Sequence, residues 1–322
     1  MLVKKSFSEI ISDFITEKRA IGYKYNKNEK LLHNLYHLYQ QMRYHEPILN
    51  KELVLKWTEK TTYETDSNRL HRISTVRCLA EYMQRMGFDA YFFPFKSVPY
   101  RANTYIPYIY TNKEIAAFFS AVDNTISPES SPFRQLQFSL IFRLLYGTGM
   151  RISEVLFLKK MDLDLKVGNI FIKHSKFGKE RILPIADSLI NRSKKYATQM
   201  QIYPIWHNSE YLFPSSIGKK YSEGTLYHHF RTYLWQADIS HGGRGKGPRL
   251  HDFRHTFAVH CLRNWVREGK NLTNALPYLS AYMGHAGSKS TQHYLRLTAE
   301  LYPDLILGLD TAYDWIIPEV KS

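Results

Sequence analysis

The chain has 322 residues, of which 44% are hydrophobic and 15% aromatic, so it can bury more than one core and is not intrinsically disordered. Its 44 Lys and Arg residues against 29 Asp and Glu give a net charge of +15, which is typical of nucleic-acid binders, although anionic membranes also attract basic chains. No apolar run of about 18 residues occurs, and acidic residues interrupt the N-terminal segment, so we expect neither a membrane span nor a signal peptide there. We therefore expect a cytoplasmic, nucleoid-associated protein.

The first part of the chain predicts a small all-helical domain. Apolar residues such as Phe7, Ile10, Ile11 and Phe14 recur at helical spacing. Helices are expected over residues 6–20, 26–42, 51–61 and 67–86. Three prolines within residues 88–110 then predict an extended segment. We place the domains at 1–98 and 111–322 with a linker at 99–110; an irregular segment inside a single domain is the alternative.

The second part predicts a mixed fold. Helices are expected over residues 112–122, 132–146, 152–159, 187–200, 222–237, 251–268 and 272–283, and strands over 170–173 and 181–184. The expected fold class is mainly α with a small β-sheet. Cys78 and Cys261 stand far apart, so we expect buried thiols, with no disulfide framework, metal site or other cofactor.

Four short blocks concentrate groups that suit a phosphodiester. They are GTGMRISEVLFL (147–158), KHSKFGKERILPI (173–185), LHDFRHTFAVH (250–260) and YMGHAGSKSTQHYLRL (282–297). Arg151 follows a Gly-Thr-Gly turn at a predicted helix start, where backbone and guanidinium can meet a phosphate, although an ordinary surface arginine would look the same. Glu154, one turn on, is either solvated or braces a neighbouring arginine or histidine.

Three further positions belong to the remaining blocks. Lys176 lies in a predicted hairpin turn, from which an ammonium can reach a groove, although such lysines often serve only solubility. His251 and Arg254 are three residues apart and so share one helix face. His285 and Tyr294 flank a Gly-Ser-Lys-Ser loop, and with 24 tyrosines in the chain Tyr294 alone would not indicate a nucleophile.

Together the four blocks resemble the tyrosine recombinase (phage integrase) family. The family's active site has an Arg, a Lys, a His-x-x-Arg, a His or Trp and a Tyr in chain order, and this sequence supplies Arg151, Lys176, His251, Arg254, His285 and Tyr294. The helical first part is similar to the family's SAM-like core-binding domain, so the resemblance covers nearly the whole chain. The basic insert HGGRGKGPR (241–249) and a long C-terminal tail depart from the family pattern and leave the subfamily open.

The resemblance implies a reaction without ATP or a catalytic metal. Tyr294 would attack a DNA phosphate to leave a 3′-phosphotyrosyl link and a free 5′-hydroxyl. Arg151, Arg254 and His285 would stabilise charge on the phosphate oxygens. Lys176 would protonate the leaving oxygen and His251 would help to deprotonate the tyrosine, although the sequence cannot separate these two proton roles.

The implied partner is double-stranded DNA at specific recombination sites. Candidate DNA-binding residues are Arg69, Arg72 and Arg77 in the first domain and Arg244, Lys246 and Arg249 in the insert, with a solvated basic face as the alternative. Residues 298–316 have the apolar spacing of an amphipathic helix, which we expect either to dock on a neighbouring subunit in a tetramer or to pack within its own chain.

Other functions compete with a recombinase that serves a mobile element. A type IB topoisomerase-like enzyme would share the chemistry, and a DNA-binding regulator could keep the fold without cleaving. A metal-dependent transposase is disfavoured because the blocks gather cations rather than paired carboxylates. The DNA sequence, the choice among integration, excision, transposition and chromosome resolution, and the involvement of accessory proteins stay open.

Overall fold

The computed structural model describes residues 5–94, 106–173, 180–243, 247–285, 291, 294–298 and 302. The chain divides into two compact units, Met1–Tyr105 and Ile106–Ser322. The predicted linker at 99–110 lies mostly outside the described residues, and Ile106 to Tyr110 belong to the second unit. Among the described residues, no helix is both long and apolar enough to span a membrane.

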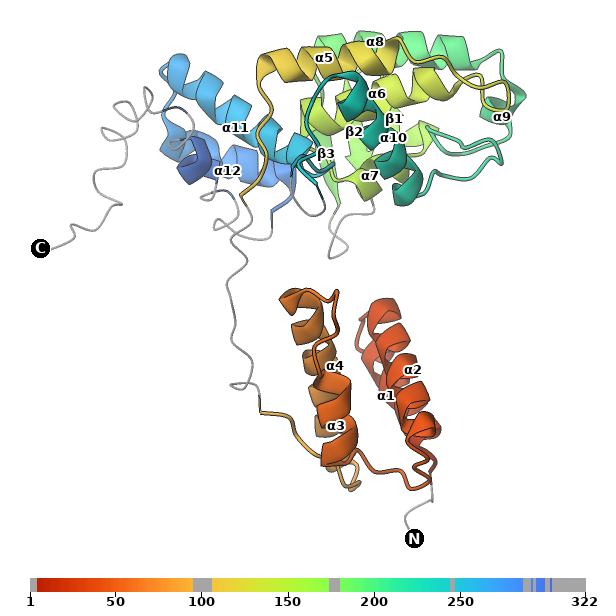
Figure 1. Ribbon diagram of the computed structural model, residues 1–322. Helices are drawn as coiled ribbons and strands as arrows, with labels where there is room; N and C mark the ends of the chain where they lie inside the picture. Colours follow the sequence, from red (N-terminus) through yellow and green to blue (C-terminus); the bar gives the residue numbers. More distant parts are fainter. Residues whose placement is uncertain are drawn as a thin grey trace, which may run out of the picture. The chain divides into compact units, whose positions relative to one another are not determined.

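The described part of the first unit consists of helices, drawn in red to orange in Figure 1. They are α1 (Phe7–Ala20), α2 (Asn26–Gln41), α3 (Lys51–Thr58) and α4 (Asp66–Arg85). Ser6 begins α1 because its side chain accepts from the Glu9 amide while Glu9 reaches back to the Ser6 amide. The core is apolar, with Phe14, Leu35 and Leu79 fully buried.

The three arginines of α4 that were predicted to meet DNA have partners inside this unit. Arg72 is an ion-pair partner of Glu64, at 2.5 Å, with its side chain only 13% exposed, and it also lies over the Trp57 ring. Arg69 donates to the Thr58 carbonyl at 2.8 Å, and Arg77 donates to the Phe93 carbonyl. These contacts tie α4 to α3 and to the segments that follow α3 and α4, and DNA binding by the three arginines stays a prediction.

The second unit is a helical assembly with one small sheet (Figure 1). Its helices are α5 (Asn112–Asp123), α6 (Arg134–Thr148), α7 (Ile152–Leu156), η2 (Lys160–Asp162), α8 (Asp187–Met200), α9 (Pro204–His207), α10 (Glu223–Gln236), α11 (Asp252–Arg267) and α12 (Leu272–Met283). Its strands are β1 (Leu163–Asp164), β2 (Asn169–Ile172) and β3 (Arg181–Pro184), paired antiparallel in the order β1-β2-β3. The predicted fold class, mainly α with a small sheet, is confirmed.

Two apolar clusters hold this unit together. Helix α6 is at the centre of the larger one, where Phe138 and Phe142 meet aromatic rings of α5, α10 and α11. Its apolar residues occur around most of its circumference, which suits a helix enclosed by α5, α8 and α11. The smaller cluster joins α11 to the adjacent α12, and it includes Tyr294 and Leu297.

The structure differs from the sequence prediction at a few local points. The helix predicted over 152–159 stops at Leu156, because the Leu158 carbonyl accepts from the Leu212 amide at 2.8 Å and Lys159 bridges to Tyr211. Elements β1, η2 and α9 were not predicted, since they are too short to show periodicity. Cys78 and Cys261 are free thiols as expected, but both are half-buried rather than buried.

Candidate active site

The predicted residues that the structure describes lie at the ends of elements in the second unit. Arg151 is the N-cap of α7, His251 is the N-cap of α11, and Arg254 lies in the first turn of α11. His285 follows the Gly284 cap of α12, and Tyr294 belongs to the helical segment 294–298. Lys176, Arg244 and Lys246 lie outside the described residues. The contacts below bring the five described positions into one site.

Arg254 joins two of the motif segments. It is 2% exposed, and its two terminal nitrogens donate to the carbonyls of Gly149 and Met283, each at 2.6 Å. Burial and the nearby charge of Arg151 lower the pKa of Arg254 to about 10, so the guanidinium is still charged at pH 7. Gly149 has φ +61° and a Cβ there would lie 2.6 Å from the Phe257 ring, so this turn requires glycine.

Glu154 is the buried anion of the site. Its side chain has no exposed surface and accepts from Arg151 Nη1 at 2.8 Å and from the Arg151 amide at 2.9 Å. Arg181 occupies both oxygens as well, at 3.0 and 2.8 Å. Burial alone would raise the pKa of Glu154, but these hydrogen bonds outweigh burial and lower it. Of the two roles considered for Glu154, the structure therefore places it as a brace for Arg151.

Tyr294 is buried among the charged and imidazole groups of the site. Its residue is 3% exposed, and its ring lies 5.8 Å from the ring of His285 and 5.4 Å from that of His255. Burial raises the pKa of Tyr294, whereas the charge and hydrogen bond of Arg254 and the charge of Arg151 oppose that rise. The same cations would lower the cost of forming a phenolate or a phosphate ester at this oxygen.

Both predicted histidines are neutral at pH 7. The pKa of His251 falls to about 4, through partial burial and then through the charges of Arg254 and Arg151. The pKa of His285 falls to about 4 for the same reasons, with Arg181 contributing. A neutral imidazole can accept a proton on one nitrogen and donate from the other. Each of the two rings can therefore both accept and donate a hydrogen bond in this state.

Three residues of the site were not predicted from the sequence: Arg181, His255 and Thr291. Arg181 shares the inner face of strand β3 with the buried Leu183, and a charged residue on that face was a usable signal. His255 is four residues after His251, and its ring lies 5.0 Å from that of His251. Thr291 hydrogen-bonds His285 Nδ1 at 2.9 Å, a contact that no spacing rule predicts.

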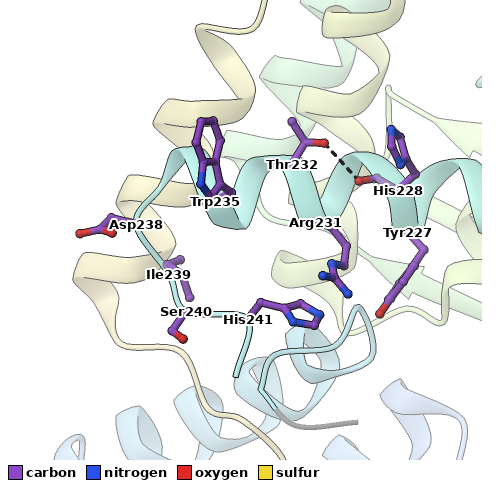
Figure 2. Close-up of a pocket in the computed structure, with 9 residues that line it drawn as sticks. All are labelled: Tyr227, His228, Arg231, Thr232, Trp235, Asp238, Ile239, Ser240 and His241. Atoms are coloured by element: carbon purple, nitrogen blue, oxygen red, sulfur yellow. Dashed lines mark hydrogen bonds between the residues drawn. The ribbon is translucent and has the colours of Figure 1, made fainter. Parts of the chain in front are cut away.

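A separate pocket of about 890 Å³ lies along one face of α10. Tyr227, His228, Arg231 and Trp235 line it from the helix, and His241, the first residue of the basic insert, lines it from the loop that follows. Figure 2 shows the guanidinium of Arg231 and the ring of His241 turned into the same space. Trp235 is 81% exposed, whereas the opposite face of α10 carries the buried Leu226, Phe230 and Tyr233.

Comparison with known proteins places this site in a family. The sequence profile described as the phage integrase family matches residues 109–300, which include every motif discussed above. The chain belongs to the phage integrase family. The resemblance to tyrosine recombinases that the motifs indicated is thereby confirmed.

Individual relatives of this family member are distant in sequence. The integrase/recombinase-type protein y4rB of Sinorhizobium fredii is 27% identical over 318 residues, covering 96% of this chain and 98% of y4rB. A XerH site-specific recombinase bound to its palindromic difH substrate is similar in structure, with TM-score 0.66, 20% identity, and coverage of 96% of this chain and 85% of XerH. A lambda integrase tetramer bound to a Holliday junction gives TM-score 0.56 at 15% identity, covering 88% of this chain and 78% of that one.

Proposed function

We propose that this phage integrase family member is a site-specific DNA recombinase that cleaves and rejoins strands through a 3′-phosphotyrosyl intermediate. The observation that carries the proposal is the position of Tyr294, which lies buried beside the rings of His285 and His255, where Arg254 and Arg151 act against the effect of burial and lower the pKa of its phenol. A buried tyrosine near the charges of two guanidinium groups is suited to attack on a phosphodiester, because the same cations can bind the phosphate.

In the proposed reaction, the Tyr294 oxygen forms a bond to phosphorus while the bond from phosphorus to the 5′-oxygen breaks. Arg151, Arg254 and His285 stabilise the charge that develops on the non-bridging oxygens. His251 takes the tyrosine proton, and Lys176 gives a proton to the departing 5′-oxygen. Rejoining is the reverse attack by a 5′-hydroxyl, so the ester conserves the bond energy and neither ATP nor a metal ion is required.

We place the biological task among integration, excision and transposition of a mobile element. Proteins of similar structure support DNA and higher assemblies as partners, since XerH is bound to its difH substrate and a lambda integrase tetramer is bound to a Holliday junction. For this chain we propose a tetramer on paired sites, with accessory proteins as further candidates. Residues 298–316, the segment expected to join subunits, lie almost wholly outside the described residues.

The proposal is tested by trapping the covalent intermediate in chelator. A duplex is first selected from a randomised pool by binding to the protein, and a set of nicks is then placed across it, so that cleavage beside a nick releases a short strand that cannot religate. With EDTA present, wild-type protein should give a protein–DNA band on denaturing gels that survives boiling and disappears on proteolysis. Nuclease mapping should leave the protein on a 3′-phosphate.

The other candidate functions give different results in the same experiment. A regulator on this fold would bind the selected duplex tightly and give no covalent band. A topoisomerase-like enzyme would give the band on unselected DNA and relax supercoils without exchanging strands between duplexes. A metal-dependent transposase would be silent in EDTA and active with Mg²⁺, which would contradict the proposed chemistry.

The exposed face of α10 is a candidate DNA-reading surface within this proposal. Tyr227, Arg231 and Trp235 recur every four residues, so one helix face presents a cation between two aromatic rings. His241 continues this face into the basic insert that holds Arg249, for which DNA contact was predicted. Helices that present such groups can read base edges or phosphates in the major groove.

Arg231→Ala should weaken binding to the selected duplex and lower the slope of log affinity against log salt by about one unit, if the guanidinium neutralises one phosphate. Fluorescence anisotropy over a salt series measures both quantities. The matched control is Arg192→Ala, because Arg192 is an exposed arginine of the same unit on α8. Equal affinity and slope for wild type and Arg231→Ala would remove this face from the DNA interface.

A further inference from the structure

Arg181 makes contacts in the site, although it has no role in the proposed reaction and is not among the predicted catalytic residues. Its terminal nitrogens donate to both oxygens of Glu154, at 3.0 and 2.8 Å, and its Nε donates to the Tyr282 carbonyl at 3.0 Å. The side chain is 11% exposed. The guanidinium is thus held by a fork-to-fork pair and a backbone carbonyl, so its principal partner in the site is Glu154.

The pair with Glu154 connects Arg181 to Arg151. Glu154 Oε1 accepts from the side chains of Arg151 and Arg181, and Oε2 accepts from Arg181 and from the Arg151 amide. A carboxylate offers about four acceptor positions, so these four bonds fill it. Two guanidinium groups around one buried carboxylate leave a net charge of +1. Without Arg181 that charge would be zero, and Arg151 would be held as the sole counter-ion of Glu154.

Arg181 also contacts the segment that leads to His285. A Cβ on Gly284 would lie 2.9 Å from Arg181 Nη1, so the backbone packs directly on the guanidinium. Arg151 Nη2 donates to the Gly284 carbonyl at 3.3 Å, so both arginines meet the turn that immediately precedes His285. Arg181 pairs with Ile172 of strand β2 in the sheet.

We infer that Arg181 is a positioning residue of the strand-cleavage site, which keeps Glu154 compensated so that the positive charge of Arg151 is available to the scissile phosphate. The inference rests on the proposed function. It differs from a purely structural role in one respect: the harm of losing Arg181 should come from Glu154 holding Arg151 as its sole counter-ion, and should therefore be relieved by removing the charge of Glu154.

The test measures single-turnover cleavage of the nicked selected duplex at saturating protein. Arg181→Met should lower the cleavage rate constant about 100-fold, the loss typical of one misplaced oxyanion donor, while changing DNA affinity less than about threefold. Arg181→Lys keeps the charge but cannot form the fork, so its cleavage rate constant should lie between those of wild type and Arg181→Met. The double variant Arg181→Met with Glu154→Gln should cleave about tenfold faster than Arg181→Met alone.

Arg143→Met is the matched control. Arg143 forms a two-pronged ion pair with Asp123, at 2.8 and 2.6 Å, and its side chain is also 11% exposed, but it lies on α6 away from the site. It should lower the melting temperature about as much as Arg181→Met and leave the cleavage rate unchanged. If Arg181→Met fails to fold, the comparison of Arg181→Gln with and without Glu154→Gln serves the same purpose, because glutamine also removes the charge but stays polar.

The outcomes separate this inference from the proposed function. Wild-type protein that forms no adduct overturns the proposed function and the inference with it. A wild-type adduct together with a normal rate in Arg181→Met overturns the inference alone. So does a double variant that cleaves more slowly than Arg181→Met, because two additive losses of buried contacts are what a purely structural role produces.

Discussion

Tyr294→Phe should abolish the covalent protein–DNA band, a loss of roughly 10⁴-fold or more in adduct formation, since the proposed reaction takes the ester oxygen from Tyr294. The variant removes one oxygen from a ring that is 3% exposed, so the packing of α11 against α12 should stay intact. DNA affinity should change little because the phenol carries no charge at pH 7. The measurement is the gel-shifted band on denaturing electrophoresis beside native binding of the same duplex.

The control for this variant is Tyr196→Phe. Tyr196 is equally buried, in the same unit, and its hydroxyl donates to the Leu212 carbonyl at 2.6 Å. Tyr196→Phe should lower the free energy of unfolding by about 1 kcal/mol and leave the cleavage rate unchanged. An adduct that persists in Tyr294→Phe would show that another residue is the nucleophile, and peptide mapping of the trapped protein would locate it. Tyr302, whose hydroxyl accepts a hydrogen bond from Arg263, is the first residue to check.

Replacing Arg254 should have the second-largest effect, because this side chain has both a chemical and a structural function. Arg254→Lys should reduce the cleavage rate by about 10²- to 10³-fold, since an ammonium cannot present two aligned donors to a phosphate. It also cannot reach both the Gly149 and the Met283 carbonyls in the geometry of a planar fork. A buried carbonyl left without a donor costs about 1–3 kcal/mol, so the melting temperature should fall as well.

The two parts of this effect can be separated with Arg263→Lys as control. Arg263 lies nine residues further along α11, on the opposite face of the helix, and is 9% exposed. Arg263→Lys should lower the melting temperature without slowing single-turnover cleavage. If Arg254→Lys melted early but cleaved normally once bound to DNA, Arg254 would be a structural clamp between Gly149 and Met283 and not a phosphate ligand.

Local sequence patterns determine most of the helices of this protein. Ser6 with Glu9 and Thr111 with Glu114 form capping boxes that begin α1 and α5, and apolar spacing then defines the buried face of each helix. These signals act within a few residues, so they can be read without knowledge of the fold. Helix α7 ended early because a contact with a distant segment, Leu158 with Leu212, competes with local preference.

The sequence by itself also determined which residue types the site contains and their order along the chain, from Arg151 to Tyr294. Only the tertiary structure decided how they are held. Arg254 is fixed by backbone carbonyls at Gly149 and Met283, which every residue possesses and no motif can mark. Arg181 enters the site because strand β3 carries it to Glu154. Burial, which neutralises the histidines and raises the pKa of Tyr294, likewise arises only when segments far apart in sequence exclude water together.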